Sequence, residues 1–224
     1  MNQAPQGTLE TDPAQEPVIT RHRHEIRRRT LRVAEIVQLT PHMIRIVFES
    51  EDLADFNSLS PDDHIKLFFE TGGEKPEMRD YTPRSFDPEA RRLVIDFAVH
   101  EAGPATAWAM QAREGDLLSI GGPRGSAVVN PVFDWYLLIG DETALPAIGR
   151  RVEELPAGVQ VMTLVAVPEA ADEQRFETAA SHVAHWVNRP VAEAADPANM
   201  VAALRGLTLP EALSFSRRWR SNGV

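Results

Sequence analysis

The stretch RDYTPRSF, residues 79 to 86, combines a cation, an aromatic ring and a hydroxyl within four positions. Arg79 can make a charge-assisted hydrogen bond to a phosphate. Tyr81 offers a flat face to an aromatic ring, and Thr82 carries a hydroxyl that can donate and accept a hydrogen bond at a ring heteroatom. Taken alone, the stretch is better explained as a strand with an exposed arginine and a packed tyrosine.

A helix start about twenty residues further along changes this interpretation. Gly103 is suited to be the N-cap, Pro104 to the first helical position, and Gly115 to stop a helix of about ten residues. The N–H groups of Ala105 and Thr106 then lack partners within the helix, and together with the positive end of the helix dipole they favour a phosphate. A phosphate site beside a flat aromatic site indicates a dinucleotide, and a flavin suits a stacking tyrosine.

The segment GDETALPAI stands where an apolar strand gives way to a helix, which is the expected place for a ligand in an open parallel sheet. Its residues Asp141, Glu142 and Thr143 are also ordinary helix caps. The chain has no GxGxxG fingerprint, and it has no GxSxG elbow or HExxH motif that would indicate hydrolytic chemistry.

The composition excludes several classes of function. The 224 residues carry 23 positive and 33 negative side chains, a net charge of −10, which argues against a nucleic-acid partner because such binders neutralise phosphates. The absence of cysteine excludes disulfides, iron–sulfur clusters and thiol catalysis. His22 and His24 do not make a metal site without further ligands, and we expect no metal. No apolar run is long enough to cross a bilayer and no export signal is present, so we expect no membrane insertion.

The elements that must position these residues follow two patterns. From residue 31 to about 130, short apolar bursts such as HMIRIVFE and LVIDFAVH are separated by Gly, Pro, Asp and Asn, which is typical of an antiparallel barrel. After residue 130, WYLLIG, an amphipathic helix and VQVMTLVAV make a βαβ unit of a parallel sheet. We therefore predict a disordered tail over residues 1–20, an antiparallel six-stranded β-barrel over 21–130 and a smaller α/β domain over 131–224.

Four motifs in the order RDYTPR, DFAVHEAGPATAWA, GGPRGS and GDETALPAI resemble the siderophore-interacting protein family, the ferric-siderophore reductases of the ferredoxin-reductase-like superfamily. The resemblance runs from about residue 25 to about residue 210. It implies an FAD-binding barrel, an NAD(P)H-binding-like α/β domain, and electron transfer from NADPH or NADH through FAD to a ferric siderophore in the cytoplasm. FAD can accept a hydride and release its electrons singly, so no catalytic side chain is required.

The resemblance also assigns residues by position. Its implied FAD contacts are Arg79, Tyr81, Thr82, His100, Gly103, Ala105 and Thr106. Its implied nucleotide contacts are Asp141, Glu142, Thr143 and Ala144. Lys66 on the strand DDHIKLFF and Arg124 in the turn GGPRG are candidate cations for an anionic ferric siderophore, or else solvated charges at strand ends.

The end of the chain departs from the family pattern. A family member continues with a strand of the type VWxAGEA, a helix and an aromatic-basic tail, whereas this chain has EALSFSRRWRSNGV. We therefore expect a C-terminally shortened α/β domain with an incomplete sheet. The leading hypothesis is a monomeric FAD-dependent NAD(P)H:ferric-siderophore oxidoreductase. The alternatives are a flavin reductase for another acceptor and a non-catalytic FAD- or siderophore-binding remnant.

Overall fold

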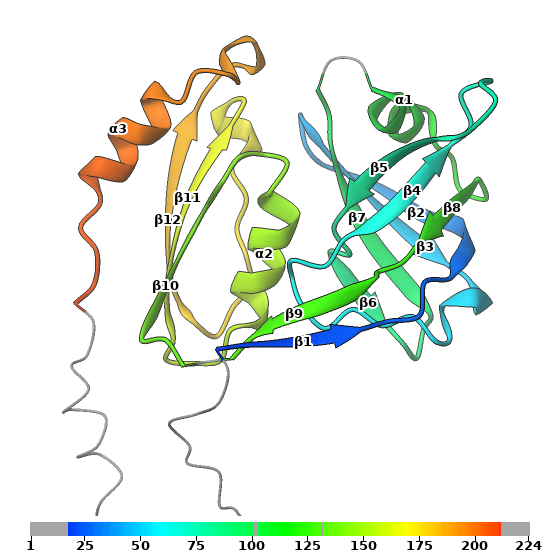
Figure 1. Ribbon diagram of the computed structural model, residues 1–224. Coiled ribbons are helices and arrows are strands. Elements are labelled where there is room, and N and C mark those ends of the chain that lie inside the picture. The colour runs from blue at the N-terminus through cyan, green and yellow to red at the C-terminus, as the bar shows by residue number, and fades with distance from the viewer. Residues whose placement is uncertain (1–17, 101–102, 131, 212–224) are drawn as a thin grey trace, which may run out of the picture.

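The computed structural model describes residues 18–100, 103–130 and 132–211 (Figure 1). The predicted disordered tail therefore falls largely on residues outside the described ranges, as does most of EALSFSRRWRSNGV. Strand β1 (Ile19–Arg23) begins inside the stretch predicted as tail, because it pairs antiparallel with β9 (Gly125–Val129). The pairing with a distant strand therefore orders Ile19 and Thr20, which the sequence placed in the tail.

The first part of the chain forms a curled antiparallel sheet of seven strands in the order β5-β4-β8-β2-β3-β7-β6. Its strands are β2 (Arg28–Thr40), β3 (Met43–Glu49), β4 (Ile65–Phe69), β5 (Glu77–Tyr81), β6 (Ser85–Asp87), β7 (Arg92–Ala98) and β8 (Leu117–Gly121). This confirms the antiparallel barrel, with seven strands in the sheet where six were predicted. Strand β6 has three residues and pairs with β7, so it is too short to leave a periodic signal in the sequence.

The interior of the curled sheet is the larger apolar core. Alternate residues of β2 are buried at its start, as period-2 geometry requires when one face of a strand is covered. Helix α1 (Pro104–Gln111) closes one end of the sheet (Figure 1). Its Trp108 packs against Phe48, Phe69 and Phe97 with ring centroids 6.0–6.1 Å apart. The start of α1 is therefore held firmly against the sheet.

The second part of the chain is a three-stranded parallel sheet in the order β10-β11-β12. Its elements are β10 (Trp135–Gly140), α2 (Leu145–Glu154), β11 (Gln160–Val167), β12 (Ser181–Asn188) and α3 (Ala198–Gly206). The βαβ unit is as predicted. Short 3₁₀ turns lie at Glu51–Leu53, Ala170–Asp172 and Val191–Glu193. Helices α2 and α3 lie on opposite faces of this sheet (Figure 1).

The two parts share apolar packing. Met43 and Ala98 of the curled sheet belong to the same buried cluster as Leu145 and Ile148 of α2. Asp172 adds polar contacts, since its carboxylate accepts hydrogen bonds of 2.8 Å from the Thr40 hydroxyl and from the backbone N–H of His42. None of the helices in the described ranges is long and apolar enough to cross a membrane.

Candidate functional site

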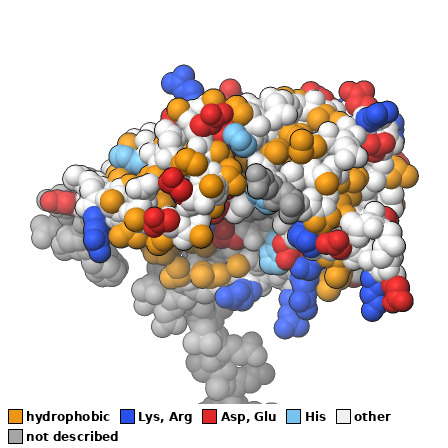
Figure 2. Space-filling model, turned by 90° about the horizontal axis from the view of Figure 1, so that it is seen from above, with side chains coloured by type: hydrophobic (Ala, Val, Ile, Leu, Met, Phe, Trp, Pro, Cys, Tyr) orange, Lys and Arg blue, Asp and Glu red, His pale blue; other side chains and the backbone are white. Residues whose placement is uncertain are grey.

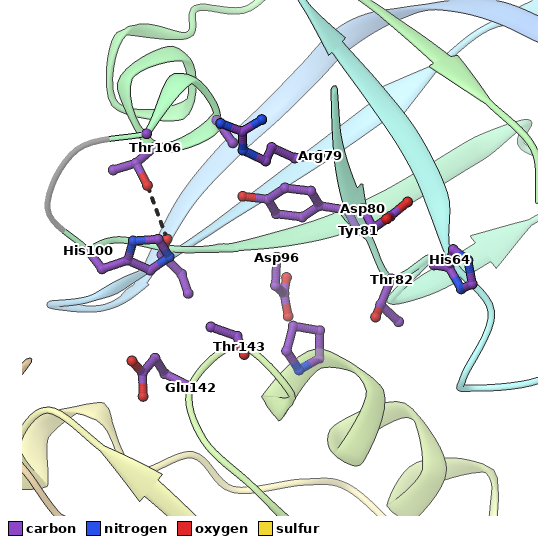
Figure 3. Close-up of a pocket in the computed structure, with 14 residues that line it drawn as sticks. His64, Arg79, Asp80, Tyr81, Thr82, Asp96, His100, Thr106, Glu142 and Thr143 are labelled. Atoms are coloured by element: carbon purple, nitrogen blue, oxygen red, sulfur yellow. Dashed lines mark hydrogen bonds between the residues drawn. The ribbon is translucent and has the colours of Figure 1, made fainter. Parts of the chain in front are cut away.

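A cavity of about 500 Å³ lies where the curled sheet, the start of α1 and the loop after β10 meet (Figure 3). It is lined by His64, Arg79, Asp80, Tyr81, Thr82, Asp96, Ala98, His100, Gly103, Ala105, Thr106, Glu142, Thr143 and Pro146. This volume is within the range of about 300–1,000 Å³ that is common for small-molecule sites. All seven predicted FAD contacts line the cavity, together with two of the four predicted nucleotide contacts.

Strand β5 supplies the aromatic wall of the cavity. Arg79 and Tyr81 are two residues apart and so share one face of the strand. The Tyr81 ring packs on Phe97 with centroids 4.7 Å apart, and burial raises the pKa of the phenol to about 12 against the opposing effect of the Arg79 charge. The hydroxyl therefore stays protonated at neutral pH and can donate a hydrogen bond into the cavity.

Arg79 is held loosely in this structure. Its guanidinium donates to Glu77 Oε2 at 3.0 Å and to the Met78 carbonyl at 2.9 Å, and close to half of each charged side chain is exposed. An exposed ion pair of this kind contributes little free energy. Arg79 can therefore exchange Glu77 for an anionic ligand at low cost.

The start of α1 supplies backbone donors. Gly103 is the N-cap in an extended conformation, and the first helical bond runs from Ala107 N–H to the Gly103 carbonyl at 2.9 Å. Pro104 has no N–H, so Ala105 and Thr106 present the first free amide groups of the helix, as the sequence predicted. The Thr106 hydroxyl lies 3.5 Å from the Ala98 carbonyl, which ties the helix start to β7.

The opposite wall comes from the loop after β10 and the start of α2. Glu142 is buried beside the cavity and its Oε2 lies 3.2 Å from Arg189 Nη2. Asp141 instead folds back on the loop, where its Oδ1 accepts bonds from the N–H and the hydroxyl of Thr143 at 2.9 and 2.6 Å. Asp141 and Ala144 are not among the lining residues. The assignment of all four to nucleotide binding stays a prediction.

The expected helix-capping role of this segment is wrong. The N-cap of α2 is Ala144, without a side-chain capping bond. Pro146 occupies one of the first two helical positions, where a missing N–H is tolerated, and it places the helix start after the three polar residues. Asp141 stabilises the turn that precedes α2 and leaves Glu142 and Thr143 facing the cavity (Figure 3).

The two candidate substrate cations lie outside the cavity lining. Lys66 alternates with the buried Ile65 and Leu67 on β4, so it faces the other side of the strand and pairs with Asp80 at 2.6 Å. Lys66 also stands opposite Gly121 in the pairing of β4 with β8, and the exposed Arg124 follows three residues later. The two cations therefore share one region of the surface, and their role in binding a ferric siderophore stays a prediction.

Five lining residues were missed by the sequence reasoning: His64, Asp80, Asp96, Ala98 and Pro146. Asp96 had a usable signal, because it is a charged residue inside the apolar strand RLVIDFA and is nearly fully buried. Its carboxylate accepts two bonds from Arg45, at 2.7 and 2.8 Å, and that partner follows from the register of β3 with β7. His64 lies just before β4 and Pro146 in the first turn of α2, and both reach the cavity through tertiary packing that local spacing does not encode.

Comparison with known proteins gives two family matches. Residues 32–77 and 71–127 match the siderophore-interacting FAD-binding domain, and residues 133–219 match the siderophore-interacting protein model. The NADPH-dependent ferric-chelate reductase of Escherichia coli (strain K12) is 39% identical over 172 residues, which cover 67% of each chain. The chain spans about two thirds of the length of the curated relatives it matches.

Solved structures agree with these matches. A siderophore utilization protein from T. fusca superposes with a TM-score of 0.81 at 33% identity, over 92% of this chain and 91% of that one. The siderophore-interacting protein SipS from Aeromonas hydrophila gives a TM-score of 0.69 at 34% identity, over 83% and 76% of the two chains. The fold and the site thus define a two-part protein with an FAD-binding-type barrel. The chain belongs to the siderophore-interacting protein family.

Proposed function

We propose that this chain is an FAD-dependent oxidoreductase that passes electrons from NADPH or NADH to a ferric siderophore. The observation that carries the proposal is one cavity, between the two parts of the chain, that gathers Tyr81, the start of α1 and the loop after β10. The barrel wall supplies features suited to a flavin dinucleotide, and the other wall is the carboxyl end of a parallel sheet, where nucleotides commonly bind. We also propose the domain division near residue 131.

The residues present fit FAD. Tyr81 offers an aromatic face that is already packed from behind by Phe97, Thr82 offers a hydroxyl beside it, and the free amides of Ala105 and Thr106 suit a pyrophosphate. Arg79 would add a charge-assisted contact to the same phosphates. When bound, FAD supplies the capacity to accept a hydride and to release two electrons one at a time, which would reduce two ferric ions to ferrous ions.

The donor and acceptor would use different surfaces. Glu142 and Thr143 line the cavity on the side of the parallel sheet, so NADPH or NADH would approach the flavin from there. The name of the Escherichia coli relative supports NADPH as the donor. Apolar, acidic and basic side chains all lie on the face seen from above (Figure 2). Because the chain carries a net charge of −10, an anionic ferric chelate requires a local cationic region, for which Lys66 and Arg124 are the candidates.

The absorbance spectrum of the purified chain tests this proposal. We expect a flavin spectrum, either as purified or after addition of FAD, that bleaches with NADPH or NADH and returns when a ferric siderophore is added without oxygen. A ferrous-specific chelator should then report two ferrous ions for each NADPH oxidised. A colourless chain that takes up no FAD would refute the proposal. If NADPH or NADH reduces the flavin, and oxygen or a quinone reoxidises it but ferric chelates do not, the chain is a flavin reductase for another acceptor.

A further inference from the structure

The second arginine of RDYTPRSF has no role in the cavity, and the structure gives it another position. Arg84 is 6% exposed and crosses from the barrel to α2, where its Nη1 and Nη2 donate to the two carboxylate oxygens of Glu153 at 2.7 and 2.6 Å. Its backbone N–H donates to the Val94 carbonyl at 2.9 Å. A bidentate arginine–carboxylate pair fixes direction as well as distance, so Arg84 holds α2 in one orientation.

A second arginine crosses the same junction in the opposite direction. Arg150 of α2 is 8% exposed, and its Nη1 donates to the Pro83 carbonyl at 2.9 Å and to the Ser58 hydroxyl at 2.8 Å. Its Nη2 donates to the Ser58 carbonyl at 2.9 Å. Arg150 and Glu153 are three residues apart and therefore share one face of α2. Each part of the chain thus sends one buried arginine into the other.

Both contacts lie next to the cavity walls. Pro83 and Arg84 directly follow Tyr81 and Thr82 of the barrel wall, and α2 directly follows Glu142 and Thr143 of the opposite wall. Behind the junction, Arg84 Nε lies 3.5 Å from Asp96 Oδ2, and Asp96 lines the cavity. The two arginines therefore join segments that directly adjoin the two walls.

A glycine on α2 allows this close approach. A Cβ on Gly149 would lie 3.1 Å from Arg84 Nη2 and 2.6 Å from the Phe176 ring. Arg84 is buried while Glu153 is about one third exposed, so losing the Glu153 carboxylate would leave a buried guanidinium with only the longer contact to Asp96, which is unfavourable. The junction is therefore rigid, and small changes in it shift one cavity wall relative to the other.

We propose that Arg84 and Arg150 form an arginine clasp. The clasp sets the distance between the barrel wall of the cavity, which contains Tyr81 and Thr82, and the opposite wall, which contains Glu142 and Thr143. The two arginines are positioning residues, and the inference rests on the proposed function in that it assigns those walls to FAD and to NADPH. The clasp governs hydride transfer into the flavin, which depends on the separation of the walls. It does not govern electron transfer out to a ferric chelate bound elsewhere on the barrel.

Two neighbouring glutamates give a matched test. Glu153→Gln replaces one of the two oxygens that accept from Arg84 by an amide donor, so the bidentate pair is lost. Glu154→Gln makes the same charge change one residue later. One carboxylate oxygen of Glu154 accepts a hydrogen bond from Arg150 Nε within the helix, and the amide oxygen of glutamine can replace it. Hydrogen exchange without any cofactor is the first measurement. We expect faster exchange in residues 82–86 and in α2 for Glu153→Gln, and no change across the junction for Glu154→Gln.

The two half-reactions are the second measurement. In rapid mixing, Glu153→Gln should slow reduction of bound FAD by NADPH by about tenfold to a hundredfold, since a displacement of about 1 Å can cost that much. Reoxidation of dithionite-reduced protein by a ferric siderophore should stay within about twofold of the parent, as should both steps in Glu154→Gln.

Equal exchange and equal rates in the two variants would overturn the clasp, and so would equal slowing of both half-reactions in Glu153→Gln. A parent protein that NADPH does not reduce would refute the proposed function instead, and the exchange experiment would still decide whether the clasp joins the walls.

Discussion

Replacing Gly149 by alanine tests the packing of α2 against the barrel. Alanine is the better helix former by about 1 kcal/mol, so an unobstructed site would gain stability. Here the new Cβ would lie 2.6 Å from Phe176 Cε1 and 3.1 Å from Arg84 Nη2. Overpacking of this kind costs about 1–3 kcal/mol, and Arg84 cannot swing aside without weakening its bonds to Glu153, each charge-assisted bond being worth about 1.5–3 kcal/mol. We expect a net loss of about 1–3 kcal/mol in the free energy of unfolding.

Urea unfolding followed by fluorescence gives this free energy from the midpoint and the slope of the transition. The matched control is Gly206→Ala at the end of α3, where a Cβ would meet nothing within 4 Å. The control should be neutral or stabilised by up to about 1 kcal/mol. If Gly149→Ala is stabilised to the same extent as Gly206→Ala, then Gly149 does not pack closely against Arg84 and Phe176. The inference that α2 and the barrel are in tight contact at this junction would then be wrong.

Three further predictions concern ligands and pH. Arg79→Ala should weaken FAD binding about ten- to a hundredfold, through the loss of one charge-assisted bond of about 1.5–3 kcal/mol, and a fluorescence titration with unchanged affinity would show that the phosphates bind elsewhere. The double substitution Lys66→Ala with Arg124→Ala should slow reduction of an anionic ferric chelate more at low salt than at high salt while FAD content is unchanged, and rates equal to the parent across a salt series would leave both as surface charges. Burial would raise the pKa of Asp172, but hydrogen bonds from Thr40 and His42 outweigh it and hold that pKa below its ordinary value. The contact therefore stabilises the folded chain above about pH 4 and is lost as the pH falls through the lowered pKa. Thr40→Ala should move acid unfolding to higher pH, and an unchanged acid midpoint would count against the contact.

Local sequence determined the elements and part of the site. Gly103 and Pro104 define the start of α1 by their backbone properties alone, and the alternation of buried residues at the start of β2 defines a strand with one buried face. Tyr81 and Arg79 share a face because they are two residues apart on a strand. These relations extend over a few residues, so propensity and periodicity are sufficient to predict them.

The cavity as a whole was decided by contacts between distant segments. Asp96 meets Arg45 through the register of two strands, and Arg84 meets Glu153, 69 residues later, through the docking of α2. The same docking brings Glu142 to the cavity and leaves Asp141 and Ala144 outside it. Successive side chains of β4 point to opposite faces of the sheet. Lys66 therefore lies on the face opposite to the buried Leu67, and it faces away from Arg79. Such distances depend on how whole elements pack, and packing is a property of the assembled core that no local spacing contains.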